Sequence, residues 1–195
     1  TVGHNDHVII IGYGISGQLL TSSLRTLSIE TVVLEMNSDN VRIGRERGDP
    51  VYYADATSEE ALGHAHLESS RAVVIMINDH QATERVLSTI RRLEIEAPVF
   101  VRTQYMKGVE DFEKFNPAGV VACEVEGGLE VLSRVLRKLQ VPRNLIIREI
   151  DDARNQTMRS DRSFKEAPLP LEEHQELKEL TVETILLIAG SRADG

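Results

Sequence analysis

A glycine-rich loop between a buried strand and a helix is the feature that most constrains the fold of this chain. The stretch HVIIIGYGISGQLL, residues 7–20, starts with aliphatic residues, passes through three glycines and then places leucines at helical spacing. G-x-G-x-x-G in this context is typical of a strand–loop–helix unit that receives a phosphate group. Gly12 permits a tight turn, Gly14 lets the backbone approach the phosphate, and Gly17 lets the helix pack closely on the strand. The N-terminus of the helix then offers free N–H groups and a partial positive charge to an anion.

A carboxylate about twenty residues beyond the loop fits the same unit. Glu35 ends a second apolar run, TVVLE at 31–35, and lies 18 residues after Gly17. A carboxylate at this place accepts hydrogen bonds from both ribose hydroxyls and repels a 2′-phosphate. The pattern therefore predicts binding of NAD(H) or an adenine nucleotide, and not of NADP. The structural alternative is a glycine turn beside a surface glutamate.

Apolar runs and helical patterns alternate along the first 141 residues. Further strands are expected at 50–55, 72–77, 98–102 and 119–122, with helices between them and another helix at about 125–140. Strict alternation predicts an α/β fold, a doubly wound parallel sheet of the Rossmann-like kind. The apolar stripe of 125–140 fits two interpretations equally: a helix that covers the sheet edge, or a crossover helix that packs on a partner.

The pattern changes after Pro142. Residues 151–181 are polar and charged around APLPL, and residues 142–181 are predicted to form a linker or C-terminal arm. Residues 182–189 again look like a strand, which needs a pairing partner because one strand is not stable alone. The chain begins at Thr1 and stops shortly after this run, so we expect a fragment of a longer protein.

Polar residues follow three further strands, at the edge where a doubly wound sheet binds its ligand. Asp55 or Thr57 could instead cap a helix, and Arg102 could instead form an ion pair. The predicted nucleotide-contacting residues are Gly12, Tyr13, Gly14, Ile15, Ser16, Gly17, Glu35, Met36, Asp55, Ala56, Thr57, Asn78, Asp79 and Arg102.

No catalytic constellation is visible in the sequence. No tyrosine has a lysine four residues later, and neither Gly-Lys-Ser/Thr nor Gly-x-Ser-x-Gly occurs. His64 and His66 are two residues apart and do not share a helix face, so no metal site is expected. Cys123 is the only cysteine, which excludes an internal disulfide, and it has no evident base; we expect a small buried side chain.

The composition of the chain excludes some classes of protein. The chain is 41% hydrophobic with a formal net charge of −9, and no apolar run approaches the length of a transmembrane helix. A broad nucleic-acid surface needs clustered lysine and arginine, so no nucleic-acid partner is expected.

Taken together, six segments resemble the regulator of potassium conductance domain, also called the RCK or TrkA-N domain. They are HVIIIGYGISGQLL, VVLEMN, YYADATSEEAL, AVVIMIND, VFVRT and GVVACEVEGGLEVLSRVL, within about residues 6–141. LEMN, VRT and CEVEGG are most similar to the RCK domains of Kef-type monovalent cation:proton antiporters. Ala54 departs from the family, which commonly has glycine before the following aspartate.

The resemblance implies that residues 1–141 form an RCK N-terminal domain that binds NAD(H) or an adenine nucleotide such as AMP or ATP. The glycines would meet the phosphates, Glu35 the ribose, Asp55 and Ala56 the adenine, and Arg102 would lie near the ligand. Residues 142–181 would be the linker, and 182–195 the truncated start of the family's C-terminal domain. A homodimer would form through the helix at about 125–140.

The function implied by the resemblance is regulatory and not enzymatic. The domain would sense a nucleotide and control an attached or associated potassium (monovalent cation) transporter or channel, at the cytoplasmic face of the inner or plasma membrane. Two alternatives remain open. One is a small NAD-dependent oxidoreductase, which would need a proton-relay residue, and the other is an interaction module with a vestigial loop.

Overall fold

The computed structural model describes residues 6–163 of the chain, with side chains to residue 157. The chain divides into two compact units, Thr1–Ile150 and Asp151–Gly195, and the first contains all of the sheet. The strand predicted at 182–189 lies outside the described residues.

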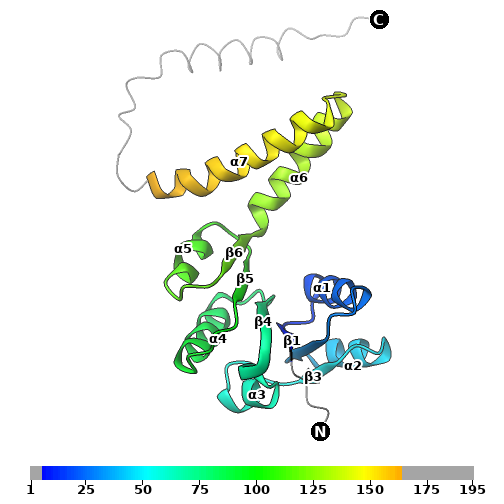
Figure 1. Cartoon of the computed structure of the whole chain (residues 1–195), viewed down its shortest axis with the longest axis vertical. Coiled ribbons are helices and arrows are strands. Elements are labelled where there is room, and N and C mark those ends of the chain that lie inside the picture. The colour runs from blue at the N-terminus through cyan, green and yellow to red at the C-terminus, as the bar shows by residue number, and fades with distance from the viewer. Residues whose placement is uncertain (1–5, 164–195) are drawn as a thin grey trace, which may run out of the picture. The chain divides into compact units, whose positions relative to one another are not determined.

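A six-stranded parallel sheet forms the centre of the first unit (Figure 1). Its strands are β1 (His7–Ile11), β2 (Thr31–Glu35), β3 (Val51–Tyr53), β4 (Ser70–Ile75), β5 (Val99–Thr103) and β6 (Gly119–Ala122), in the spatial order β3-β2-β1-β4-β5-β6. The connecting helices are α1 (Ile15–Thr26), α2 (Ser38–Glu46), α3 (Glu59–His64), α4 (His80–Arg92) and α5 (Lys107–Glu113), with a short 3-10 turn η1 (Leu67–Ser69). The predicted doubly wound fold is therefore confirmed, and the strand order reverses direction between β1 and β4.

Alternating side chains of the strands build two separate cores. On one face, Ile9 and Ile11 pack with buried residues of α3, α4 and α5, such as Leu62, Val86 and Phe112. On the other face, Val8 and Ile10 pack with residues of α1 and α2. All five residues of β1 are buried because both faces of this central strand are covered.

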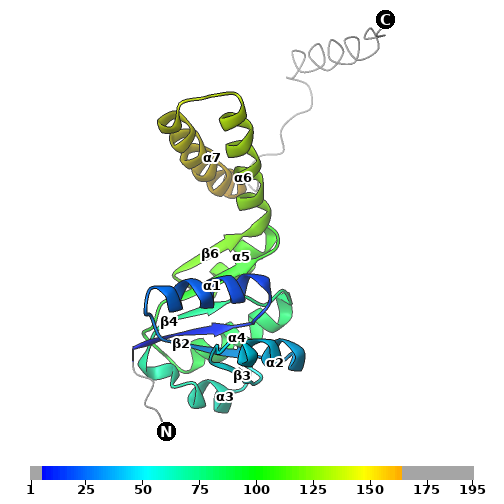
Figure 2. The same cartoon turned by 90° about the vertical axis from the view of Figure 1, so that its right-hand side faces the viewer.

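Helices cover the β4–β6 half of the sheet mainly on one face (Figures 1 and 2). Phe100 of β5 and Val121 of β6 point to the other face, and they are 42% and 48% exposed. An apolar strip of sheet surface thus remains open beside α1.

Two helices follow the sheet: α6 (Cys123–Lys138), which continues directly from β6, and α7 (Arg143–Ser163). The first of them confirms the helix predicted at about 125–140, with ends shifted by two residues. The second shows that the first part of the segment predicted as a linker or arm, residues 142–181, is helical. Ile146, Ile150 and Ala153 recur at helical spacing, Pro142 precedes the first turn, and Arg154 pairs with Asp151 at 3.3 Å.

Candidate functional site

A cavity of about 310 Å³ lies at the carboxyl ends of β1, β2 and β4, where the strand order reverses. It brings together nine of the fourteen predicted site residues, namely Gly12, Gly14, Glu35, Met36, Asp55, Ala56, Thr57, Asn78 and Asp79. Open parallel sheets bind their ligands at such a reversal. The predicted residues therefore converge on one place, although they come from four separate loops.

The three glycines of the loop have different surroundings. Gly12 has φ +103°, a conformation that favours glycine, and a Cβ on Gly17 would lie 2.1 Å from the carbonyl oxygen of Gly12. The conformation and packing of the protein's own backbone thus require glycine at both positions. A Cβ on Gly14 would meet no atom of the chain within 4 Å, so the protein's own packing does not require glycine there.

The N-terminus of α1 is open toward the cavity. Gly14 is the N-cap, no side chain caps the helix, and its first turn contains no acidic residue. By contrast, the Asn37 side chain caps α2 and the Asp79 side chain caps α4. An uncapped helix N-terminus leaves N–H donors and the positive end of the helix dipole for an anion.

Glu35 connects the glycine loop to the beginning of α2. Its carboxylate accepts hydrogen bonds from Tyr13 N at 2.6 Å and from Asn37 N at 2.7 Å, and Asn40 Nδ2 lies at 3.4 Å. Two carboxylate oxygens offer about four acceptor positions, so room remains for one further donor. The carboxylate therefore shapes the loop and can still receive a hydroxyl group.

The other two carboxylates of the cavity also accept hydrogen bonds from their own loops. Asp55 accepts from the backbone N and the hydroxyl of Thr57, at 2.9 and 2.8 Å, and Asp79 accepts from Ala82 N at 2.6 Å. The alternative that Asp55 or Thr57 would cap the following helix is not met, because these two residues bond to each other within the loop. The formal N-cap of α3 is Ser58, whose side chain makes no capping bond.

Five predicted site residues do not line the cavity. Gly17 packs α1 on the loop, Ser16 is partly buried, and the side chain of Ile15 is 89% exposed. Arg102 does not line the cavity but contacts Asn78, which does. The alternative that Arg102 forms an ion pair is not met among the described residues. Arg102 donates to Asn78, Cys123 and Gln104 instead.

Tyr13 contributes its backbone to the loop and its side chain to the core. The ring is fully buried, and the hydroxyl donates to the carboxylate of Asp49, which also pairs with Arg25 at 2.5 Å. Burial and the neighbouring Asp49 charge raise the pKa of the Tyr13 phenol to about 12. The phenol is thus protonated at neutral pH and faces away from the cavity.

Sequence reasoning missed Asn40, Met76 and Ile77, which line the cavity, and Asp49, which holds Tyr13. The helical spacing of Asn40 from its cap Asn37 places it on the turn beside Glu35, and this signal was available. Met76 and Ile77 were assigned to the fourth strand, but β4 ends at Ile75. Asp49 is 36 positions from Tyr13, and no local pattern relates the two.

A second cavity, of about 530 Å³, lies between α3 and the β3 edge and shares Leu34, Ala54 and Asp55 with the first. It contains no part of the glycine loop. Among the described residues, no group of three or more His, Cys, Asp or Glu side chains is arranged to hold a metal ion. No helix within residues 6–163 has both the length and the apolar character needed to cross a bilayer.

The chain is similar in sequence to proteins of a known family. The TrkA-N domain family matches residues 8–122. The putative K(+) efflux antiporter KefB of Alkalimonas amylolytica is 29% identical over 194 residues, which are 98% of this chain and 29% of that protein. The chain thus spans less than a third of the length of this relative.

Three solved structures have a similar fold. The TrkA-N domain of the inner membrane protein YbaL from Escherichia coli is 26% identical, covers 71% of this chain and 98% of its own, and has a TM-score of 0.61. The AMP-bound Shewanella denitrificans Kef CTD is 16% identical, with 80% and 94% coverage and a TM-score of 0.69. The GsuK channel bound to NAD is 19% identical, with 70% and 24% coverage and a TM-score of 0.59.

Proposed function

This chain belongs to the TrkA-N domain family, and from that premise we propose that it is a nucleotide-sensing regulatory domain of a membrane potassium (monovalent cation) transporter or channel. The observation that carries the proposal is the cavity that joins Gly14, the open N-terminus of α1 and Glu35. One part of it suits a phosphate and the other a ribose. Relatives whose names describe K(+) efflux antiporters support the transport context.

The ligand that we propose is NAD(H) or an adenine nucleotide such as AMP or ATP. The phosphates would lie at Gly12–Gly17, the ribose hydroxyls at Glu35, and the adenine near Asp55, Ala56 and Thr57, which line the same cavity. Structures of similar fold that contain AMP, NAD or ADP support this choice of ligand class.

A regulatory role fits the cavity better than catalysis. Its three carboxylates, Glu35, Asp55 and Asp79, each accept a hydrogen bond from a backbone N–H group of their own loops. Tyr13, the tyrosine of the glycine loop, is buried against Asp49 and cannot give a proton to a ligand. No lining residue is thus placed as the proton relay that an oxidoreductase needs.

Regulation would act through a homodimer and an attached or associated membrane protein, at the cytoplasmic face of the membrane. Val131 and Val135 of α6 and Leu139, which caps its end, are 62%, 49% and 68% exposed, an apolar surface that a second copy could cover. The exposed Phe100 and Val121 add apolar surface to the same unit. Nucleotide binding would shift the population of two dimer arrangements, and no chemical step is required.

Isothermal titration calorimetry of the chain with AMP, ATP, NAD and NADH tests the proposal. We expect saturable binding of at least one of them, and Glu35→Ala should weaken it by about 1–3 kcal/mol because charge-assisted hydrogen bonds to the ribose are lost. Glu35→Gln is the companion variant, since it keeps one acceptor for the loop. Absence of binding for all four nucleotides would favour the interaction module.

Incubation with NADH and a panel of carbonyl compounds separates regulation from the alternative of a small NAD-dependent oxidoreductase. We expect no enzyme-dependent loss of NADH absorbance. Steady turnover would favour the oxidoreductase.

A further inference from the structure

One arginine lies between the nucleotide cavity and the first turn of α6. Arg102 of β5 donates from Nη1 to Asn78 Oδ1 at 2.5 Å and from Nε to Cys123 Sγ at 2.9 Å. Asn78 lines the cavity, and Cys123 is the first residue of α6. The same guanidinium thus contacts the wall of the cavity and the start of the helix that we place at the dimer interface.

Two further hydrogen bonds of this turn go to the same short segment. Glu124 N donates to the carbonyl oxygen of Gln104 at 3.2 Å, and the Glu124 carboxylate accepts from Met106 N. Gln104 and Met106 follow β5 directly. Residues 102–106 therefore position the start of α6, and Arg102 is the member of this segment that is hydrogen-bonded to the cavity wall.

The hydrogen bonds of Arg102 are of a kind that an anionic ligand can displace. Its acceptors are two amide oxygens, with Gln104 Oε1 at the long distance of 3.5 Å, and a sulfur atom. Bonds from a guanidinium to a phosphate are charge-assisted, often bidentate and roughly twice as strong as bonds to neutral groups. A phosphate in the cavity therefore competes for the donors that hold Cys123.

We propose that Arg102 is a positioning residue that couples occupancy of the nucleotide site to the first turn of α6. This inference rests on the proposed function and adds the path by which the ligand is sensed. In the empty site, the guanidinium holds Cys123 and Asn78 together. When a nucleotide binds, the guanidinium turns toward its phosphate and releases Cys123. The coupling is reciprocal, as binding equilibria require.

The chain contains its own reporter for this movement, because Cys123 is its only cysteine. The experiment measures the rate at which N-ethylmaleimide alkylates the full 195-residue chain, without ligand and at AMP or NAD concentrations that calorimetry shows to be saturating. We expect nucleotide to raise the rate by about fivefold, the size of effect that corresponds to one net hydrogen bond. The rise follows because the guanidinium no longer covers the sulfur.

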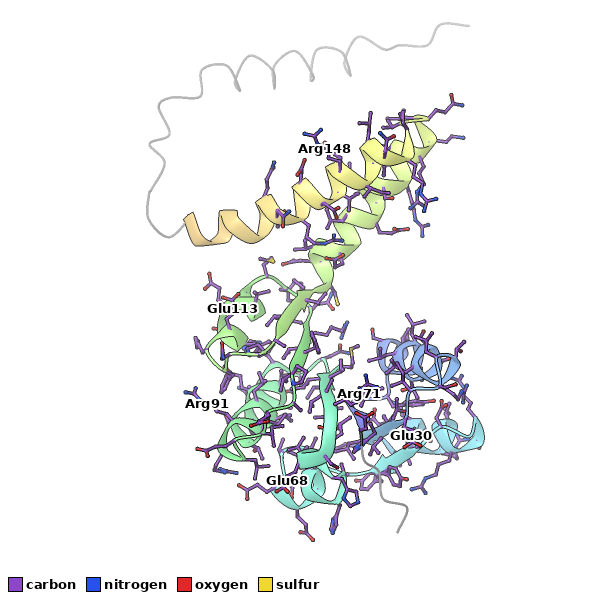
Figure 3. The ribbon with its side chains drawn as sticks, viewed as in Figure 1. Glu30, Glu68, Arg71, Arg91, Glu113 and Arg148 are labelled. Atoms are coloured by element: carbon purple, nitrogen blue, oxygen red, sulfur yellow. The ribbon has the colours of Figure 1, made fainter. Side chains whose placement is uncertain are left out.

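Three variants isolate the role of Arg102. Arg102→Gln removes the charge, and Arg102→Lys keeps it but offers a single ammonium group, which does not span Asn78 and Cys123 together. Both should react at the high rate with or without nucleotide, because neither side chain bridges Asn78 and Cys123. Arg71→Gln is the matched control: Arg71 lies near the start of β4, at the opposite end of the strands, and pairs with Asp6 (Figure 3). It should behave like the unmodified chain.

Two results would overturn the coupling while leaving the proposed function in place. One is nucleotide binding with an unchanged or lower alkylation rate, and the other is a full nucleotide effect in Arg102→Gln and Arg102→Lys. A chain that binds neither AMP nor NAD in calorimetry would overturn the proposed function and the coupling together. Circular dichroism of each variant shows whether it is folded before the rates are compared.

Discussion

At the scale of single residues, the three loop glycines differ in what requires them. Gly12 has a positive φ, and Gly17 lies against the carbonyl of Gly12, so the fold itself excludes a side chain at both positions. Gly14 has no neighbour within 4 Å of a Cβ and a φ of −68° that any residue adopts. The proposed contact with a phosphate gives a reason for a glycine at position 14, and this difference can be measured.

Gly14→Ala should weaken nucleotide binding without weakening the fold. We expect affinity to fall at least tenfold, about 1.4 kcal/mol, because the methyl group occupies the place of a phosphate oxygen. The free energy of unfolding in urea should change by no more than about 0.5 kcal/mol. Gly17→Ala is the control and should destabilise by about 1–3 kcal/mol through overpacking. Equal losses of stability in both variants would contradict the assignment of Gly14.

Tyr13 is held in the glycine loop by hydrogen bonds to both its backbone and its side chain. Its backbone N–H is bound by Glu35, and its hydroxyl is bound by the buried Asp49. Arg25 pairs with the same Asp49 and connects α1 to the turn after α2. The loop is thus held at its second residue from both sides, which favours a preformed phosphate site.

The raised pKa of Tyr13 gives a pH dependence of stability with a defined sign. Because the folded-state pKa of about 12 exceeds the ordinary value of 10.0, the stabilising effect is complete below pH 10 and is lost as pH rises through 12. We expect the excess stability of the unmodified chain over Tyr13→Phe to shrink by about 2 kcal/mol between pH 9 and pH 12. Urea unfolding at each pH measures it. Tyr105→Phe, at an exposed tyrosine, is the control and should show little such change.

At the scale of elements, the sheet was predictable because its central strands, β1 and β2, are buried on both faces. Continuous apolar runs such as Val8–Ile11 and Thr31–Leu34 appear in any sequence that builds a parallel sheet, and all six strands were found in order. The ends of strands were less certain. Met76 and Ile77 continue the apolar run of β4, yet they leave the ladder and turn toward the cavity.

The elements that were missed depend on relations that local patterns do not contain. The helical start of the segment after Pro142 was obscured by its charge, although Ile146 and Ile150 recur at helical spacing. The contact of Tyr13 with Asp49 spans 36 positions, and that of Arg102 with Cys123 spans 21. Such contacts follow from strand order, so composition and periodicity could place the candidate site but not its supporting bonds.

A charge on the apolar surface of α6 should prevent dimerisation. We expect Val135→Asp to give monomers in multi-angle light scattering, because an unpaired carboxylate would be buried between the two copies. Arg137→Glu, on an exposed position of the same helix two residues from Val135, changes the charge outside the apolar stripe and should leave the dimer intact. A dimer that survives Val135→Asp would place the interface elsewhere.

At the scale of the whole molecule, the chain matches 29% of the length of its KefB relative, and the role proposed for it is that of a sensing unit. Its predicted division into a domain to residue 141, a linker to 181 and the start of another domain stays a proposal. A sensing unit needs only a difference in ligand affinity between two arrangements, and a site that spans four loops of one sheet suits that requirement.

Nucleotide should raise the thermal stability of the first unit. At a ligand concentration one hundred times the Kd, the folded state gains about 2.7 kcal/mol relative to the unfolded chain. Differential scanning calorimetry with and without AMP or NAD measures the shift in Tm. Gly14→Ala serves as the control and should show a smaller shift at the same ligand concentration. A Tm that stays constant at saturating nucleotide would contradict binding to the folded loop.

The residues that line the nucleotide cavity include no lysine or arginine. Until a bound nucleotide draws in Arg102, its attraction for a phosphate therefore comes from fixed amide dipoles at very short range, which dissolved ions screen far less than they screen a cluster of mobile surface charges. A receptor of this construction keeps nearly the same affinity when the concentration of potassium around it rises or falls. For a component of a potassium transport system, this would separate the metabolic signal that it reads from the electrolyte that the system moves.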